Sequence, residues 1–222
     1  MKNRLTILMI LMVTIFFSCK KEKDEDAIVK EKIEIVIPQQ YVDTLKGLGM
    51  NVFEGSNPPN VEGIYLLDSL ILVNSNIPGS IVGTKFSDTK MKFSNQSATN
   101  FSLTVEQKSL SSLSTSENSV VTGDGDNFTI WGNLTSIRNG DTAIIATILS
   151  GQVSDDGIKN LNFALINVDY VFNGSNQFLL EGQARFIKDQ NDFCPRVDNF
   201  DLLLEGNYAE KLTNIFSNQE FK

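Results

Sequence analysis

Apolar and polar residues alternate along most of the chain. In "FSLTV", Phe101, Leu103 and Val105 alternate with Ser102 and Thr104. The segment "FTIWGNLTS" at residues 128–136 repeats the pattern. A period of two is typical of a β-strand that buries one face and exposes the other. The alternation therefore predicts half-buried strands.

Other apolar runs of strand length are separated by short turn segments. We expect strands over residues 63–73, 90–94, 101–105, 119–122, 128–136, 142–153, 160–172 and 177–187. The segments between them supply Gly, Asn or Asp, which adopt left-handed turn conformations readily. Parallel neighbours need crossovers of a dozen or more residues, so about eight strands joined by such short turns indicate an antiparallel, all-β meander.

Two stretches depart from the strand pattern. Residues 38–49 place Pro38 at a first helical position, follow it with apolar residues at helical spacing and end in glycine. They predict a short helix. Residues 206–222 predict a second short helix after the last strand. We expect one β domain over residues 32–222, with the first helix and a linker over 32–62 and the sheet over 63–205.

Two architectures satisfy this meander, an up-and-down barrel and a two-sheet β-sandwich. Gly63, Ile64 and Tyr65 open the first expected strand. They resemble the Gly-x-Trp at the start of the barrel in the calycin and lipocalin superfamily, with Tyr65 in place of the Trp. The resemblance implies a lipocalin-like barrel, and the sandwich is the alternative.

A barrel interior must be filled by side chains or must line a pocket. The chain contains 15 phenylalanines. Large aromatic side chains close a core more often than they leave a cavity, so we expect a packed interior. The residues expected to point inward are Tyr65, Phe93, Phe101, Leu103, Phe128, Ile130, Phe163 and Phe178.

The N-terminus has the pattern of a secretory signal. Lys2 and Arg4 precede an apolar run from Leu5 to Phe17, which is too short to span a bilayer. Ser18 and Cys19 follow, and the segment resembles the lipobox of bacterial lipoproteins with Phe where Leu is preferred. The resemblance implies a signal peptide over residues 1–18 and lipidation of Cys19. The alternatives are an ordinary cleaved signal with a chance Cys and a short N-terminal anchor.

Residues 19–31 are highly charged and lack aromatic residues, so we expect a solvated tether. The cluster "KDEDA" within it resembles acidic export signals that place lipoproteins on the outer face of the outer membrane. A plain linker is the alternative. We expect a lipid-anchored protein of the outer membrane at the cell surface, with a periplasm-facing position as the alternative.

A second resemblance covers most of the mature chain. The stretches "NPPNVEGIYL" and "SGQVSDDGIKNLNFAL" are similar to stretches shared by a group of lipoproteins of unknown function. No activity is established for this group, so the resemblance implies none for this chain.

Composition excludes several kinds of chemistry. The chain contains no histidine, which excludes Ser-His-Asp and Cys-His nucleophiles and zinc bound by histidine. A net charge of −8 argues against nucleic acid as a partner, because phosphate binding needs clustered Lys and Arg. We expect no cofactor. With Cys19 lipidated, Cys194 has no disulfide partner, and we expect its thiol to be inert.

Paired carboxylates for glycoside hydrolysis are the alternative to a binding role. The candidate acids are Glu54, Glu62, Asp68, Glu106, Glu181 and Glu205. Asp124 and Asp126 have the alternating spacing of calcium ligands, although a hairpin turn is the favoured interpretation.

The remaining candidate sites are aromatic or hydroxyl residues. Tyr65 and Trp131 are candidate ligand-binding aromatics, because glycan-binding proteins present aromatic faces to sugars. Thr44, Ser69 and Thr142 each follow an Asp and precede an aliphatic residue, which resembles the acceptor triplet for O-glycosylation in some envelope proteins.

These observations favour a monomeric, non-catalytic binding or structural module of the cell envelope that is held at the membrane by lipid. Its expected partners are glycans or other envelope proteins. A surface glycoside hydrolase and a carrier of a small apolar ligand are the alternatives.

The first prediction concerns the lipid anchor. Cys19→Ala removes the acylated thiol, so we expect the protein to move from the membrane fraction to the soluble fraction. Two or three acyl chains hold a protein on a bilayer essentially permanently. Fractionation followed by immunoblotting measures the change. Equal membrane retention of the variant and the wild type would show that the lipobox assignment is wrong.

Overall fold

The computed structural model describes residues 25–170 and 177–201. The expected signal peptide, Cys19, Glu205 and the expected C-terminal helix lie outside these residues. The elements are α2 (Glu25–Val36), α3 (Gln39–Gly47), β1 (Gly63–Leu67), β2 (Leu70–Ser75), β3 (Thr89–Ser94), β4 (Ser102–Ser109), β5 (Leu113–Asp124), β6 (Asn127–Arg138), β7 (Asp141–Ser154), β8 (Gly157–Tyr170), β9 (Ala184–Asp189) and β10 (Phe193–Pro195).

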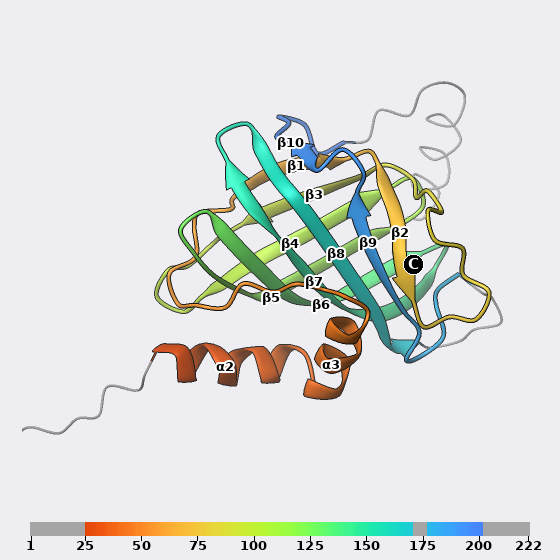
Figure 1. Cartoon of the computed structure of the whole chain (residues 1–222), viewed down its shortest axis with the longest axis horizontal. Helices are drawn as coiled ribbons and strands as arrows, with labels where there is room; N and C mark the ends of the chain where they lie inside the picture. The colour runs from red at the N-terminus through yellow and green to blue at the C-terminus, as the bar shows by residue number, and fades with distance from the viewer. Residues whose placement is uncertain (1–24, 171–176, 202–222) are drawn as a thin grey trace, which may run out of the picture.

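The strands form one antiparallel sheet in the order β1-β3-β4-β5-β6-β7-β8-β9-β2, and β10 pairs with β8. From β3 to β9 each strand pairs with the next one along the chain, as Figure 1 shows. This is the meander that short turns favour, because two-residue hairpins join only antiparallel neighbours. The predictions of an all-β class and of antiparallel order are confirmed, and the expected helix at residues 38–49 is α3.

The sheet is strongly rolled. β1 and β2 stand at opposite edges, yet only Asp68 and Ser69 separate them in the chain. Three Cα steps of about 3.8 Å span at most roughly 11 Å, so the two edges approach each other at this point. β10 adds a second link, because it pairs with β8 while Arg196, the next residue, forms a β-bridge with Tyr65 of β1. Among the described residues β1 and β2 form no ladder with each other, so the closure is partial.

The break at Asp68 was not predicted, since residues 63–73 were expected to form one strand. The described part of the expected strand over 177–187 also differs, because β9 begins only at Ala184. β10 has three residues and was missed. Three residues are too few for an alternation to be recognised.

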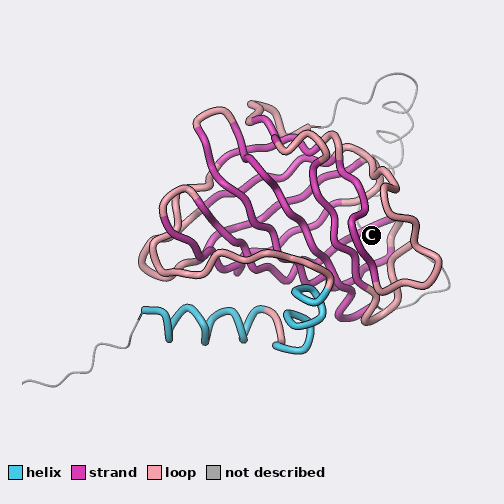
Figure 2. Tube along the Cα trace, viewed as in Figure 1, coloured by secondary structure: helices cyan, strands magenta, loops and turns pink. Residues whose placement is uncertain are grey.

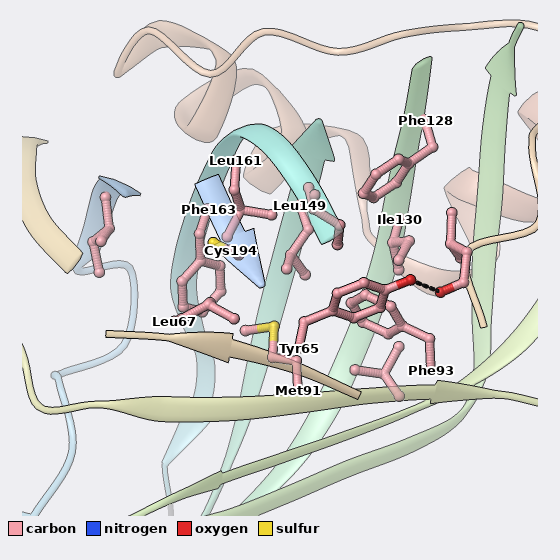
Figure 3. Packing of buried hydrophobic residues seen from close by; sticks show 14 of the residues in the cluster. Tyr65, Leu67, Met91, Phe93, Phe128, Ile130, Leu149, Leu161, Phe163 and Cys194 are labelled. Carbon is pink, nitrogen blue, oxygen red and sulfur yellow. Dashed lines mark hydrogen bonds between the residues drawn. The ribbon is translucent and has the colours of Figure 1, made fainter. Parts of the chain in front are cut away.

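The inner face of the rolled sheet carries one buried apolar cluster. Figure 3 shows Tyr65, Phe93, Phe128 and Phe163 of this cluster turned toward one another from different strands. Val61 lies beside them and accepts a hydrogen bond of 3.0 Å from the Tyr65 hydroxyl. The remaining members include Leu67, Leu70, Leu72, Met91, Leu103, Val105, Val121, Ile130, Leu134, Leu149, Ile158, Leu161, Ile187 and Cys194.

The outer face carries a second cluster, which α2 and α3 cover from one side (Figure 2). Val29 of α2 and Leu45 of α3 pack in a cluster that also contains Trp131 of β6 and Ile148 of β7. Neither described helix is long and apolar enough to cross a bilayer.

Helix α2 differs from the expected tether, because residues 25–31 are helical. Val29, Ile33 and Ile37 recur every four residues and so form an apolar stripe on one side of α2 and the turn that follows it. Val29 and Ile37 are buried, and Ile33 packs against the outer cluster. The charges of this segment occupy the remaining faces.

Six of the eight residues expected inside belong to the inner cluster, namely Tyr65, Phe93, Leu103, Phe128, Ile130 and Phe163. Phe101 belongs to the outer cluster instead. Its φ of 58° is left-handed, so the regular alternation of β4 does not extend back to it. Phe178 lies in the segment between β8 and β9.

The second prediction tests the inner cluster. Phe128→Ala removes a fully buried ring, so we expect the free energy of unfolding to fall by about 3–5 kcal/mol. Urea denaturation measures the change. The control is Ile81→Ala, because Ile81 is 74% exposed and its substitution should change stability by no more than about 0.5 kcal/mol. Equal effects of the two substitutions would contradict the assignment of the core.

Candidate functional site

A cavity of about 430 Å³ opens at one end of the rolled sheet. Its floor is the inner cluster, since Leu70, Leu134, Phe163 and Ile187 belong to both. Small-molecule sites commonly have volumes of roughly 300–1,000 Å³. The expectation of a packed interior is therefore correct for one end of the sheet and wrong for the other.

The walls of the cavity follow the strand period of two. On β6, Leu134, Ser136 and Arg138 line it in succession, and on β9 Arg185 and Ile187 do so. Such alternate residues share one face of a strand. Further inward residues are Thr89, Gln107, Ser109, Ser114, Ile145, Thr147 and Leu165.

One part of the lining is rich in hydroxyl groups. The Ser114 and Ser136 hydroxyls of the neighbouring strands β5 and β6 lie 2.7 Å apart and form a hydrogen bond. Ser109 and Ser112 form another across the β4–β5 turn, also at 2.7 Å. The cavity therefore offers small polar side chains beside its apolar floor.

Two arginines enter the same cavity. The Arg138 guanidinium carbon lies 5.5 Å from the centre of the Phe178 ring. The Arg185 guanidinium carbon lies 5.6 Å from the centre of the Phe86 ring. Each cation is thus positioned by an aromatic ring, an arrangement that holds a guanidinium in place while leaving its N–H groups available.

Burial lowers the pKa of Arg138. Burial also lowers the pKa of Arg185, and the nearby positive charge of Arg138 lowers it further. Both side chains remain charged at neutral pH, because the ordinary pKa of arginine lies above 12. The lining contains no Asp and no Glu among the described residues. The cavity is therefore a positively charged chamber in a protein whose net charge is −8.

Exposed aliphatic side chains surround the mouth. Among the described residues, the large exposed hydrophobic side chains are Ile35, Ile81, Val82, Leu110, Leu113, Ile137 and Leu180. All except Ile35 lie in the segments that also supply the lining near the mouth. These are the β2–β3 loop, the β4–β5 turn with the start of β5, the end of β6 and the segment before β9.

Neither of the expected ligand-binding aromatics lines this cavity. Tyr65 is buried, and its hydroxyl accepts a hydrogen bond of 2.9 Å from Nη2 of Arg196. Burial raises the pKa of Tyr65, and the charge of Arg196 opposes that rise. Trp131 is buried beneath the helices, and its Nε1 donates to Oγ1 of Thr122 at 3.0 Å. Their described contacts are those of core residues.

Asp124 and Asp126 lie at the exposed β5–β6 turn. Gly123 and Gly125 there have φ values of 147° and 58°, which suit glycine. Among the residues that the structure describes, no three Asp, Glu or Cys side chains form a group that could hold a metal ion.

The candidate carboxylates other than Glu205, which lies outside the described residues, do not converge on the cavity. Glu106 pairs with Lys92 at 2.6 Å and Glu54 with Lys46 at 3.4 Å. The Glu62 carboxylate accepts a hydrogen bond from the backbone N–H of Gln96, while Asp68 and Glu181 are exposed. At the opposite end of the sheet, Asp126 and Asp155 border an open depression together with Lys159 and Arg196.

The three candidate glycosylation residues lie in different environments. Thr44 is within α3, and its hydroxyl donates to the Gln40 carbonyl at 2.9 Å. Ser69 lies between β1 and β2, and its hydroxyl accepts from the Asn191 amide at 2.7 Å. Thr142 is exposed near the start of β7.

Arg138 and Arg185 were not singled out from the sequence. The expected strand over 128–136 ended two residues before Arg138. Extending its alternation through Leu134 and Ser136 places Arg138 on the inward face, so the signal was present. Arg185 likewise lies two residues before Ile187, so the two share one face of β9.

No protein-family model, curated protein or solved structure matches this chain.

The third prediction concerns Cys194, which is fully buried. Burial raises the pKa of its thiol well above the usual range, and the neighbouring Asp189 raises it further. Because the thiolate is the reactive form, we expect the native Cys19→Ala variant to resist a disulfide reagent at pH 8. Denaturant should release one reactive thiol. Rapid labelling of the native variant would contradict this prediction.

Proposed function

We propose that the protein is a non-catalytic binding module of the cell envelope, which holds one small organic molecule inside a lipocalin-like barrel. The observation that carries this proposal is the cavity of about 430 Å³ whose walls are the inward side chains of β3 to β9. A concave site with an apolar floor and a few polar groups is the usual form of a small-molecule site.

The barrel interpretation is supported by the link between the sheet edges. β1 and β2 are joined by two residues, and β10 bridges β8 and β1. Gly63 supports it as well. Its φ is 151°, and a Cβ atom there would lie 2.7 Å from Nη1 of Arg196. The glycine therefore allows β1 and the β10 segment to approach closely.

A binding role is favoured over hydrolysis by the lining. A glycosidase needs two carboxyl groups on either side of the scissile bond. The cavity lining supplies hydroxyls, amides and guanidinium groups instead. The aliphatic side chains around the mouth further support a ligand with an apolar part, because they provide apolar surface along its path.

In this proposal the lipid on Cys19 holds the domain at the outer membrane, and residues 20–24 together with α2 connect the anchor to the sheet. The ligand then exchanges at the membrane surface. The proposal makes the protein a carrier or receptor of the envelope rather than an enzyme.

The fourth prediction tests the cavity as the ligand site. We expect N-phenyl-1-naphthylamine, a neutral fluorophore, to bind with saturation at one site. Gln107→Trp should weaken this binding at least about tenfold, because Gln107 is a half-buried lining residue and the larger ring fills space. Fluorescence titration measures the dissociation constant.

The matched control for this titration is Thr135→Trp. Thr135 is exposed on the other face of β6, between Leu134 and Ser136. The Thr135→Trp substitution adds the same ring outside the cavity, so we expect the affinity for the fluorophore to equal that of the wild type. Absence of saturable binding by the wild type, or equal weakening by both substitutions, would overturn the proposed function.

A further inference from the structure

We propose that the ligand is an amphipathic organic anion, and that Arg138 and Arg185 bind its carboxylate, sulfonate or phosphate group. This inference rests on the proposed function, because it assigns a chemical class to the molecule in the same cavity.

Within the part of the chain that the structure describes, few acceptors meet the N–H donors of Arg138 and Arg185. Arg138 donates from Nη1 to the Gln177 carbonyl at 2.9 Å. Its Nε is buried and has no acceptor among the described residues. For Arg185, the described part of the chain provides a ring contact and no ion pair. Each guanidinium carries five N–H donors, so most of them have no acceptor among the described residues and could bind a ligand.

Arg138 and Arg185 line the same partly buried chamber, and the charge of Arg138 acts on Arg185. Two like charges in such a chamber destabilise the empty state, since a low local dielectric strengthens their repulsion. The lining residues that the structure describes include no Asp or Glu to neutralise them. A bound anion removes this repulsion and satisfies the donors, and guanidinium groups match the planar fork of a carboxylate or the oxygens of a phosphate.

The strand register separates charged from apolar lining residues along the cavity. Arg138 lies four residues beyond Leu134 on β6, at the end of the strand next to the Asn139–Gly140 turn. Four residues of strand span roughly 13 Å. Arg185 is likewise nearer the mouth than Ile187 is. The charged groups therefore lie toward the mouth and the aliphatic groups toward the floor.

This order defines the ligand. Its anionic end lies near Arg138 and Arg185, and its apolar part extends toward Leu134, Phe163 and Ile187. The Ser136 hydroxyl lies between the two levels on β6 and is placed to bind a polar atom next to the anionic group. The roughly 13 Å of strand suits a medium-length acyl chain or a fused-ring system.

The experiment compares two probes that share one skeleton. 1-Anilinonaphthalene-8-sulfonate carries a sulfonate, and N-phenyl-1-naphthylamine lacks it. We expect the full-length protein to bind the sulfonate at least about tenfold more tightly, as charge-assisted hydrogen bonds allow. Arg138→Gln and Arg185→Gln should each abolish most of this preference and leave the affinity for the neutral probe within about twofold. Arg138→Lys should retain more of the preference for the sulfonate than Arg138→Gln does, because lysine keeps the positive charge.

Lys188→Gln is the matched control. Lys188 is a surface cation on the same strand as Arg185, and its ammonium lies 3.8 Å from the Asp192 carboxylate. The Lys188→Gln substitution should leave the affinities for both probes unchanged.

If the wild type binds the two probes with equal affinity, and the arginine substitutions do not change this, the anion inference is overturned while the cavity proposal stands. Failure of both probes to bind the wild type would overturn the cavity proposal itself. A preference that Lys188→Gln also removes would assign the effect to general surface charge and overturn the inference.

Discussion

The two-residue link between β1 and β2 is the constraint on which the rest of the structure depends. Nine strands hydrogen-bond in one path with β1 at one edge and β2 at the other, and Asp68 and Ser69 must join those edges. The sheet satisfies this link only by rolling. Rolling gives the sheet an inner and an outer face. Every strand therefore places alternate residues on the inner face and the others on the outer face. The inner cluster, the cavity and the surface that the helices cover all follow from this requirement.

The interior is divided along its length by residue type. Tyr65, Phe93 and Phe128 fill one end, where β10 and Arg196 come close to β1. Toward the other end the inward positions of β5 and β6 carry Ser114 and Ser136, which occupy little space beside the larger lining side chains, and the cavity lies there. The same strands therefore supply a rigid core and a chamber supported by it.

Much of the architecture could be predicted because it depends on local patterns. Alternation identified most strands, and short turns fixed their antiparallel order. Other features depend on distant residues. Nothing within residues 63–73 indicates that the chain changes sheet edge at Asp68. The apolar stripe of α2 is hidden among charges, and its burial depends on a sheet surface formed far along the chain.

The candidate site was harder to predict than the fold. The phenylalanine content correctly indicated a core, but composition does not say where along each strand the large residues lie. Arg138 adjoins an Asn-Gly turn and is easily interpreted as a solvated residue of a loop. Its importance arises from lining the same cavity as Arg185, in a described lining that holds no Asp or Glu, and these are properties of the rolled sheet. Contacts between strands decide such properties, and a single sequence does not display them.

A crystal structure of the protein with bound 1-anilinonaphthalene-8-sulfonate would test the central claim most directly. We predict that the naphthalene ring lies between β6 and β9 above Leu134 and Ile187. The sulfonate oxygens should lie about 2.7–2.9 Å from guanidinium nitrogens of Arg138 and Arg185. A probe bound elsewhere, such as the groove between α2 and the sheet near Trp131, or an interior already filled by other parts of the chain, would contradict the account.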